Sequence, residues 1–549
     1  MSSSKKKQLR KEQYMTERQV AAAKEAKKMK TYTLTFFVVI ALVVCIFIGA
    51  VVTNPIKNVI YKNTDAVVIG DYTLSSVDVN YFYIDAVNSY INQYSDYIQY
   101  IIDVNKPLNE QVTNKETGET WADSFLESAK NSIQSTYALY EMAIKDGHKL
   151  TEDEQKTLDS SFATQQLYAA YYGYNNLNAY LRAMYGNGAD ENSYRNYLEV
   201  SALARSYLTA YSDSLEYDAD DLLNYQAKEP YKFNAYTFAT FYVNASSYRE
   251  GGTEDDKGNI TYSDEEKAAA IKAAEEAANK LAAGEYADLD AFDAAIKAMP
   301  VNKDAITVAS LKNNDVLYAE VDSRFIDWLI GKVESEDKDA EPTFVERKEG
   351  DITVIPYITG TGDNEVINGY YVIRFGSVNS NTFFMKNVRH LLVQFEGGKT
   401  DSTTGVTTYT EAEKAKAKIE ADKLLAEWEK GNKSEASFAE LVKKNTDDVA
   451  SKENGGLYED VYPGQMVEAF EDWCYDAERK AGDYGIVETE YGYHIMFYVG
   501  ESETTFRDFL ITSVMRSEDV ETWYNGLVEA AKLTVLTTKH IDLDMVLGH

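Results

Sequence analysis

The sequence predicts an α+β protein built from several domains, and three observations lead to this prediction. An uncharged apolar run lies near the N-terminus, capped helices with apolar residues at helical spacing follow it, and a segment of strands and helices then occurs twice. A length of 549 residues allows several domains of about 150 residues each. Hydrophobic residues make up 44% of the chain, which is enough for large cores.

Charge divides the chain into a short basic leader and a long acidic remainder. Residues 1–30 carry ten lysines or arginines against three glutamates, whereas the whole chain has a formal charge of −34. An acidic surface repels phosphate backbones, so the composition excludes nucleic acid as a partner. We expect residues 1–30 to form a basic tail on the cytoplasmic side of a membrane, without a core of its own.

The apolar run near the N-terminus predicts a single transmembrane helix. From Leu34 to Val52 no residue is charged, and this length crosses a hydrocarbon core of about 30 Å. Basic residues before the run predict an anchor over residues 31–53, with the N-terminus in the cytoplasm and the bulk of the chain outside the membrane. A cleaved signal peptide is the alternative, with small residues at Gly49 and Ala50, but the long apolar run favours the anchor.

The two cysteines predict neither a lipid anchor nor a disulfide. Val44 precedes Cys45 where a lipoprotein signal has a small residue, and apolar residues continue after it. Cys474 is the sole cysteine of the exported part, which therefore forms no internal disulfide. We interpret Cys474 as a small hydrophobic residue on a helix.

Residues 60–232 are predicted to form a helical domain that begins with two short strands. Ala66–Thr73 indicates strands on either side of a turn, and a capping box at Ser75 begins the first helix. The later helices are predicted over Asp123–Asp146, from Thr151 onward, over Glu191–Asp213 and over Asp218–Gln226. Within residues 504–549, Thr505–Leu533 is predicted to be helical again.

Residues 233–378 and 384–503 share one order of features. A capped helix begins at Ser263 in the first segment and at Thr410 in the second, and each helix ends at a glycine after the same number of residues. Phe325-Ile-Asp-Trp corresponds to Phe470-Glu-Asp-Trp, and a Gly-Tyr-Tyr strand corresponds to a Gly-Tyr-His strand. A repeat in this register predicts two tandem domains of one fold.

Four motifs of the second segment carry a family resemblance. They are the strand Arg389–Val393, the turn Gly455-Gly456, Gly464-Gln465-Met466 with Phe470 four residues later, and the strand Gly492–Ile495. In this order the segment resembles the parvulin family of peptidyl-prolyl cis–trans isomerases, which implies two tandem parvulin-like α/β domains. The helical region is similar to the N-terminal chaperone domain of SurA-, PrsA- and PpiD-like membrane-anchored foldases. In such foldases the helix after the isomerase domain packs back onto the chaperone domain, and we expect the same of residues 504–549.

The parvulin resemblance implies a set of site residues without a metal or a cofactor. Apolar side chains would form a cup for the proline ring, and a carboxylate, two histidines and a hydroxyl would lie beside the X–Pro bond. The implied substrate-binding residues are Tyr458, Met466 and Phe470, and the implied catalytic residues are His390, Asp447, Thr489 and His494. An apolar enclosure would raise the pKa of the carboxylate and let it donate a hydrogen bond.

Several assignments stay open at the level of the sequence. Asp448 lies beside Asp447 and is an alternative for the carboxylate. Met466 and Phe470 are four residues apart and are equally consistent with an ordinary core. Paired histidines are also consistent with a purely structural hydrogen bond, which is the interpretation we favour for His494.

Both segments depart from the family pattern. The first contains no histidine, so we expect a degenerate domain that serves packing or client binding; Tyr371 stands where the second has His494, and Val321 stands where it has Met466. In the second, Val461 replaces an aromatic residue, and two residues are inserted before the glycine turn. Its loop over residues 397–408 has one lysine and no arginine cluster, so selectivity for phosphorylated Ser/Thr-Pro is not expected.

Two functions of different classes follow from these features. The first is an extracytoplasmic, membrane-anchored isomerase and chaperone whose partners are unfolded exported polypeptides with X–Pro bonds. The second is a non-catalytic holdase that uses both parvulin-like domains for client binding. A surface adhesin also fits the anchor and the acidity, but it leaves the paired histidines unexplained.

Overall fold

The computed structural model describes residues 56–95, 97–299, 310–335 and 342–547. The predicted basic tail and transmembrane anchor lie outside these residues. Within the described ranges, no helix combines the length and the apolar character that a membrane crossing requires. The chain forms two compact units: one joins the residues up to Glu216 with those from Ser517 onward, and the other spans Tyr217–Arg516.

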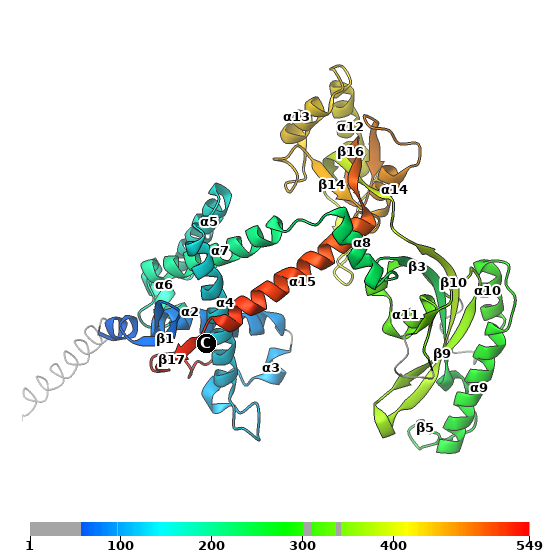
Figure 1. The fold of residues 1–549 in the computed structure, drawn as a ribbon, viewed down its shortest axis with the longest axis horizontal. Coiled ribbons are helices and arrows are strands. Elements are labelled where there is room, and N and C mark those ends of the chain that lie inside the picture. The colour runs from blue at the N-terminus through cyan, green and yellow to red at the C-terminus, as the bar shows by residue number, and fades with distance from the viewer. Residues whose placement is uncertain (1–55, 96, 300–309, 336–341, 548–549) are drawn as a thin grey trace, which may run out of the picture. The chain divides into compact units, whose positions relative to one another are not determined.

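The first unit is a helical domain in which a β-hairpin precedes the long helices, as the sequence predicts, and residues 56–62 form a further helix before the hairpin (Figure 1). Strands β1 (Asp65–Ile69) and β2 (Tyr72–Ser75) precede helix α2 (Ser76–Gln93), whose first turn is closed by the predicted capping box between Ser75 and Asp78. The remaining helical elements of this unit are α3 (Ile98–Ile101), η1 (Leu108–Glu110), α4 (Trp121–Lys145), α5 (Glu152–Tyr171), α6 (Leu177–Tyr185) and α7 (Glu191–Ser214). A capping box at Thr120 begins α4 two residues earlier than predicted.

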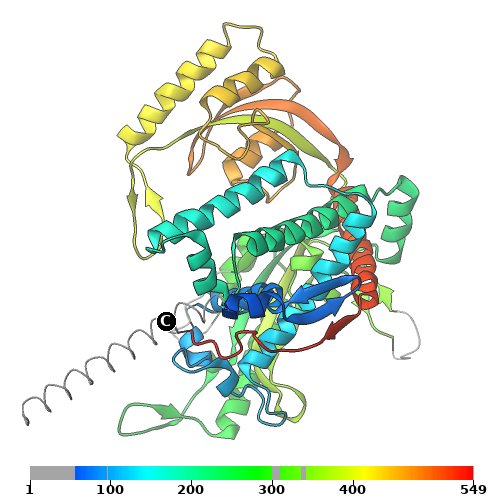
Figure 2. The ribbon, with the colours of Figure 1, turned by 90° about the vertical axis from the view of Figure 1, so that its left-hand side faces the viewer.

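The C-terminal segment completes the first unit. Helix α15 (Phe506–Ala530) ends in this unit, where Trp523 stacks on Tyr211 of α7 with ring centroids 3.8 Å apart. Strand β17 (Leu533–Val535) then pairs antiparallel with β1, which gives the sheet order β17-β1-β2. Figure 2 shows the red strand β17 beside the blue hairpin. The sequence did not predict this strand, because three residues carry too weak a local pattern.

The second unit contains two four-stranded antiparallel sheets with the same topology. The first sheet has the order β6-β3-β10-β9 and the second has the order β14-β11-β16-β15. The strands of the first are β3 (Ala235–Asn244), β6 (Leu311–Leu317), β9 (Ile352–Thr359) and β10 (Val366–Asn379). Those of the second are β11 (Phe384–Gln394), β14 (Leu457–Val461), β15 (Tyr484–Glu488) and β16 (Gly492–Thr505).

Corresponding helices accompany the two sheets. After α8 (Ala219–Lys228), the first sheet has α9 (Asp264–Ala282), α10 (Leu289–Lys297) and α11 (Ser323–Leu329), and the second has α12 (Glu411–Trp428), α13 (Glu435–Asn445) and α14 (Glu468–Tyr475). The predicted capping boxes at Ser263 and Thr410 begin α9 and α12. Short hairpins β4–β5 (Thr253–Glu254, Ile260–Thr261), β7–β8 (Lys332–Val333, Thr343–Phe344) and β12–β13 (Lys399–Thr400, Thr407–Thr408) complete the unit.

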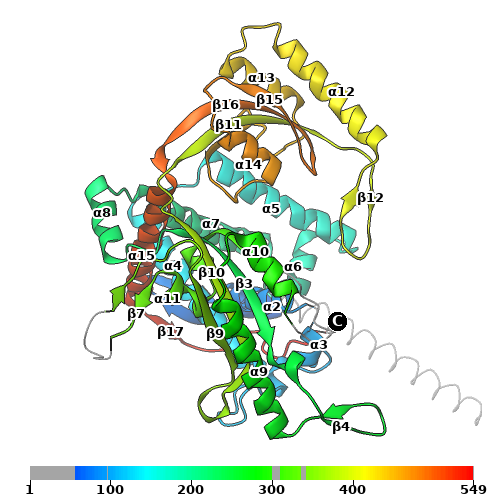
Figure 3. The same cartoon turned by 90° about the vertical axis from the view of Figure 1, so that its right-hand side faces the viewer.

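Helices α12 and α13 cover one face of the second sheet and α14 covers the other (Figure 3), and each face carries a core. Leu391 of β11 and Ile495 of β16 point toward α12 and α13. Val388 and Met496 point to the opposite face, where they pack with Phe470 and Cys474 of α14. Because side chains alternate along a strand, His390 and His494 share this α14 face. Cys474 is fully buried on its helix, as the sequence predicts.

Candidate active site

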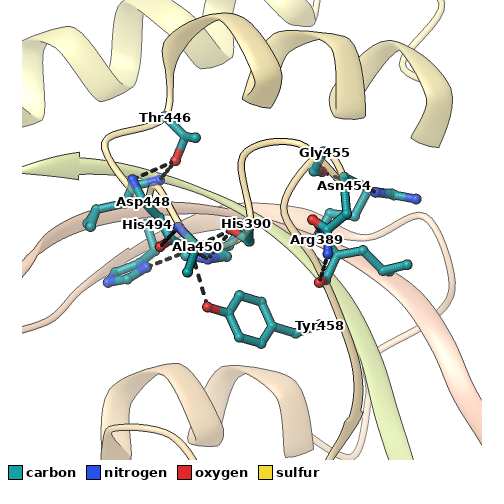
Figure 4. Close-up of polar contacts among 12 residues, drawn as sticks. Arg389, His390, Thr446, Asp448, Ala450, Asn454, Gly455, Tyr458 and His494 are labelled. Carbon is teal, nitrogen blue, oxygen red and sulfur yellow. Dashed lines mark hydrogen bonds and ion pairs between the residues drawn. The ribbon is translucent and has the colours of Figure 1, made fainter. Parts of the chain in front are cut away.

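Two buried histidines lie at the centre of the second sheet. His390 is paired across the strands with Met496, and His494 is paired with Leu392, so the two imidazoles are diagonal neighbours on β11 and β16. Their Nδ1 atoms are 3.0 Å apart. Nε2 of His494 lies 2.9 Å from Oγ1 of Thr489, and Nε2 of His390 lies 3.0 Å from Oδ2 of Asp448. The sheet therefore aligns a polar chain from the Thr489 hydroxyl to the Asp448 carboxylate, and Figure 4 shows its members His494, His390 and Asp448.

A cavity of about 330 Å³ opens onto this chain. It is lined by His390, Leu392, Asp448, Tyr458, Gln465, Met466, Val467, Phe470, Tyr491 and His494. The Phe470 ring stands edge-on to both imidazoles, with centroid distances of 5.5 Å to each. The cavity thus combines an apolar wall with one carboxylate and two imidazoles.

The carboxylate at the cavity is Asp448, not the predicted Asp447. Oδ2 of Asp447 accepts the backbone N–H of Gln394 at 2.9 Å, and its own N–H is bonded to the carbonyl of Leu392. Asp447 thereby attaches the loop after α13 to β11. Its neighbour Asp448 consequently lies on the opposite side of the chain and faces His390.

Four donors converge on the Asp448 carboxylate. Its Oδ2 receives the hydroxyls of Ser451 and of Tyr458, the latter at 3.2 Å, in addition to His390, and its Oδ1 accepts the N–H of Ala450 at 3.1 Å. Burial acts to raise the pKa of Asp448, but the hydrogen bond from Ser451 and the interaction with His390 outweigh it and lower the pKa. The expectation of a carboxylate with a raised pKa is therefore wrong, because the enclosure is rich in donors.

The hydrogen-bond chain has one direction that satisfies every atom. An ionised Asp448 only accepts, so His390 carries its proton on Nε2 and accepts at Nδ1. His494 then donates from Nδ1 to His390 and accepts at Nε2 from the Thr489 hydroxyl, which in turn accepts the N–H of Tyr491 at 3.2 Å. Burial, the main cause, lowers the pKa of His494 to about 3, and it also lowers the pKa of His390 against the opposing effect of Asp448. Both imidazoles are therefore neutral at pH 7.

The glycine turn fixes one wall of the site. Gly456 has φ of +75°, and its carbonyl accepts the N–H of His390 at 2.9 Å. A Cβ at this glycine would lie 2.2 Å from the carbonyl oxygen of His390, so no other residue fits. Arg389 holds the turn from the other face of β11, since its guanidinium donates to the carbonyls of Asn454 and Gly455 at 2.8 and 3.1 Å (Figure 4). The inserted Asn454 is thus part of the turn's anchor.

The family model described as the PPIC-type PPIase domain matches residues 370–500, a range that contains all of this site. This part of the chain is similar to the PPIC-type PPIase domain, and we refer to it below as the PPIC-type domain. Foldase protein PrsA 1 of Listeria monocytogenes serotype 4b (strain F2365) is 39% identical over 71 residues, which are 13% of this chain and 24% of that protein. Foldase protein PrsA 2 of the same strain is 42% identical over 64 residues, 12% of this chain and 22% of that protein. The chain therefore matches about a quarter of the length of these curated relatives.

Two solved structures match parts of the chain. Peptidylprolyl isomerase PrsA from Bacillus anthracis is 22% identical, with a TM-score of 0.16, and the match covers 27% of this chain and 59% of that one. The PPIase domain of TbPar42 is also 22% identical, with a TM-score of 0.17, and the match covers 21% of this chain and 99% of that one.

Most residues that the sequence suggests for the PPIC-type site lie together. His390, Tyr458, Met466, Phe470 and His494 line the cavity, and Thr489 reaches it through His494. Sequence reasoning missed Leu392, Ser451, Gln465, Val467 and Tyr491. Side chains alternate along a strand, so the position of Leu392 two residues after His390 could have placed it at the site. The contact of Ser451 with Asp448 depends on the path of a loop, which the sequence does not show.

The first sheet holds different residues at the equivalent positions. Tyr371 of β10 is paired with Tyr242, just as His494 of the PPIC-type domain is paired with Leu392, and Thr240 occupies the place of His390. Arg324 of α11 lies 4.9 Å from the ring centroids of both Tyr357 and Tyr371, and its guanidinium is bonded to Asp322. An arginine–tyrosine cluster thus stands where the second copy has its imidazoles.

Proposed function

We propose that the protein is a peptidyl-prolyl cis–trans isomerase and chaperone that assists the folding of exported polypeptides outside the cytoplasmic membrane. The observation that carries the proposal is the cavity of the PPIC-type domain, where an apolar wall faces a fixed chain of His494, His390 and Asp448. The curated relatives named foldases support the chaperone part.

Prolyl isomerisation is favoured by a site that combines an apolar wall with a negative charge. Rotation about an X–Pro bond has a barrier of about 18–20 kcal/mol, because amide resonance is lost in the twisted state. The twisted imide is less polar than the planar one, so an apolar wall that removes water favours it. A negative charge near the carbonyl oxygen also disfavours the charge-separated resonance form of the planar amide. No bond is broken other than the partial double bond, and the expected site needs neither metal nor cofactor.

Each side chain has a proposed role in this scheme. Met466 and Phe470 hold the proline ring, and Tyr458 closes the cup while its hydroxyl stays bonded to Asp448. Asp448 supplies the negative charge, and His390, His494 and Thr489 hold it in place through their directed hydrogen bonds. Because these dipoles are already oriented, little reorganisation accompanies rotation.

Exchange spectroscopy on a short Ala-Pro peptide tests the proposal with the full chain. We expect faster cis/trans exchange, with a loss of at least about tenfold in Met466→Ala, because the proline ring loses its wall. Met184→Ala is the matched control, since Met184 lies in the first unit and is half-exposed. Uncatalysed exchange in the presence of the folded chain would leave the holdase as the function.

The holdase role has its own support in the first unit. The end of α5 exposes large apolar side chains, among them Leu167 at 70% and Tyr171 at 82%. Clustered exposed apolar side chains are typical of sites that bind other polypeptides. Suppression of aggregation of an unfolded client, measured in Met466→Ala, separates this activity from isomerisation: we expect it to persist, and to weaken in Leu167→Ser/Tyr171→Ser.

The first parvulin-like copy, residues 233–378, is proposed to be catalytically silent. Its arginine–tyrosine cluster has neither the imidazoles nor the carboxylate chain of the second copy. Changes in the second copy alone should therefore abolish exchange, and Arg324→Ala should leave it unchanged.

We also propose that residues 31–53 anchor the chain and that the two units lie outside the cytoplasm. The support is the uncharged run and the basic residues before it. Added protease should digest the two units in intact spheroplasts, and protection of both would reverse the orientation.

A further inference from the structure

The helix over residues 56–62, which precedes the β-hairpin of the first unit, exposes three large apolar side chains. The exposed fractions are 52% for Ile56, 59% for Val59 and 43% for Ile60. Residues with the spacing i, i+3 and i+4 lie on one face of a helix, so these three side chains form a single apolar stripe. An amphipathic helix normally buries such a face against another surface, whereas this helix leaves it exposed.

The opposite face of the helix is attached to the first unit. Three of its side chains contact residues far away in the chain: Asn58 contacts Gly188, Tyr61 contacts His540, and Lys62 pairs with Asp190. The amide oxygen of Asn58 accepts the N–H of Gly188 at 2.9 Å, and the ring centroids of Tyr61 and His540 lie 4.5 Å apart. Asn58, Tyr61 and Lys62 repeat the spacing of the stripe two residues later, about 200° around the helix axis. The contacts with the unit therefore hold the stripe on the outward side.

The stripe begins close to the proposed membrane anchor. Residues 31–53 are uncharged, and only Asn54 and Pro55 separate them from the helix. Three steps of about 3.8 Å between successive Cα atoms reach at most about 11 Å. The polar layer on each side of the hydrocarbon core is roughly 5–8 Å thick. The helix therefore begins in the headgroup layer or directly beside it, whatever path these two residues take.

We propose that the apolar stripe lies on the outer surface of the membrane, with its side chains at the boundary between the lipid headgroups and the acyl chains. The helix then lies parallel to the membrane and holds the first unit against the lipid by one fixed side. This inference rests on the proposed anchor, and it goes beyond that anchor, which alone does not determine how the unit faces the lipid.

The physical reason is that lipid is the apolar surface within constant reach of the stripe. Transfer of apolar side chains from water to the headgroup boundary is favourable, and a helix with one apolar face lies in the plane of the interface for this reason. The anchor in the same chain gives the stripe a high effective concentration of lipid, so a diffusing polypeptide would have to displace that lipid. The side chains on the opposite face are polar or amphipathic, which suits the side that faces away from the acyl chains.

Fluorescence quenching by lipid-bound nitroxides tests the orientation of the helix in the full chain. The chain is reconstituted into phosphatidylcholine vesicles that carry a nitroxide near the top of the acyl chain. The fluorophore NBD is attached to one added cysteine in each of four variants: Ile56→Cys, Lys57→Cys, Val59→Cys and Ile60→Cys. The parent chain, treated in the same way, gives the background from its two native cysteines. We expect the labels on the stripe to be quenched at least about twofold more strongly than the label at Lys57, because only they point toward the acyl chains.

Lys57 is the matched control, because it is exposed and lies closer to the anchor in the chain than Val59 and Ile60 do. Quenching that decreases steadily along the chain, with Lys57→Cys above Val59→Cys, would indicate an upright helix and overturn the inference. Ile419→Cys labels a similarly exposed residue of α12 in the second unit, 69% exposed, and should show no quenching above the background. Stripe labels that behave like this one would indicate that the stripe faces water. A blue shift without quenching would indicate that protein covers the stripe, and either result overturns the inference.

Two further measurements separate the possible failures. The substituted side chains are exposed, so each variant should unfold at the same temperature as the parent chain, and quenching is compared among variants that do so. Washing the vesicles with alkaline carbonate tests the anchor itself. A chain that stays with the lipid while its stripe is unquenched overturns only the inference, whereas a chain that is released overturns the proposed anchor as well.

Discussion

His390 and His494 meet through their Nδ1 atoms, 3.0 Å apart, on adjacent strands. One of these two nitrogens has to donate and the other has to accept, so protonating both imidazoles would break the contact. The lowered pKa values of both residues agree with this geometry. The chain from Thr489 to Asp448 consequently keeps its direction throughout the physiological pH range.

The first prediction concerns pH. The pKa of each histidine is lower in the folded chain than in the unfolded chain, so the unfolded state binds more protons as the pH falls below about 6.5. The stability of the PPIC-type domain should therefore be constant above pH 7 and should fall by up to about 1.4 kcal/mol per pH unit for each histidine below pH 6.5. In the folded chain, the imidazole ¹⁵N shifts of His494 should stay constant from pH 8 to pH 5, and those of His390 should change only below the usual imidazole range. A titration step near pH 6.5 at either residue contradicts this prediction.

The second prediction compares two neighbouring carboxylates. Asp448→Asn should reduce isomerisation of an Ala-Pro peptide by at least about tenfold, because the amide has no charge and presents a donor to donors. Asp447→Asn should change the rate by less than about twofold, since an amide oxygen still accepts the N–H of Gln394. Exchange spectroscopy measures the isomerisation rate of both variants. A larger loss of rate in Asp447→Asn than in Asp448→Asn would assign the catalytic carboxylate to Asp447.

The third prediction compares two glycines with positive φ. Gly456 at +75° and Gly464 at +88° both prefer to lack a Cβ, but only the first would place it against backbone. Gly464→Ala should cost about 1 kcal/mol of stability and Gly456→Ala several kcal/mol, since β14 has to move away from β11. Hydrogen–deuterium exchange of β11 and β16 should rise strongly in Gly456→Ala alone. Similar exchange in the two variants would show that the turn tolerates a side chain.

The fourth prediction concerns the C-terminal segment of the first unit. Asp542, whose N–H donates to the buried Asn80 at 3.0 Å, has a pKa raised from 3.8 to about 6 by burial and by nearby Asp544. A raised pKa means that stability is lost as the pH rises from about 4 to about 6, where the unfolded carboxyl ionises first. Asp542→Asn should therefore stabilise the unit by up to about 3 kcal/mol at pH 7.5 and have little effect at pH 4. Urea unfolding at both values tests this, with the exposed Asp213→Asn as control.

Local patterns were sufficient for the helices that begin with a capping box and for the internal repeat, whereas α3 and α6 were not predicted and α15 ends at Ala530, before the predicted Leu533. The capping boxes at Ser75, Ser263 and Thr410 each involve side chains within four residues of the sequence. The start of each helix can therefore be predicted from a short stretch of sequence. The paired histidines were predicted from the parvulin resemblance, because each lies in one of the motifs that carry it.

Contacts between segments that are distant in the chain could not be predicted from the sequence. The choice of Asp448 over Asp447 depends on which of two adjacent residues the loop uses to bond β11, and both are equally polar. The lowered pKa of Asp448 depends on Ser451 and Tyr458, which the fold brings to the same oxygen.

The sequence by itself determined the α+β class, the doubled parvulin-like segment and the histidine pair, because periodicity, caps and motif order are properties of short stretches. The tertiary structure alone decided which carboxylate completes the site and that β17 pairs with β1, since Val67 and Val535 lie at opposite ends of the described chain. A hydrogen bond between such segments is chosen by the path of the whole backbone, and no local preference encodes that path.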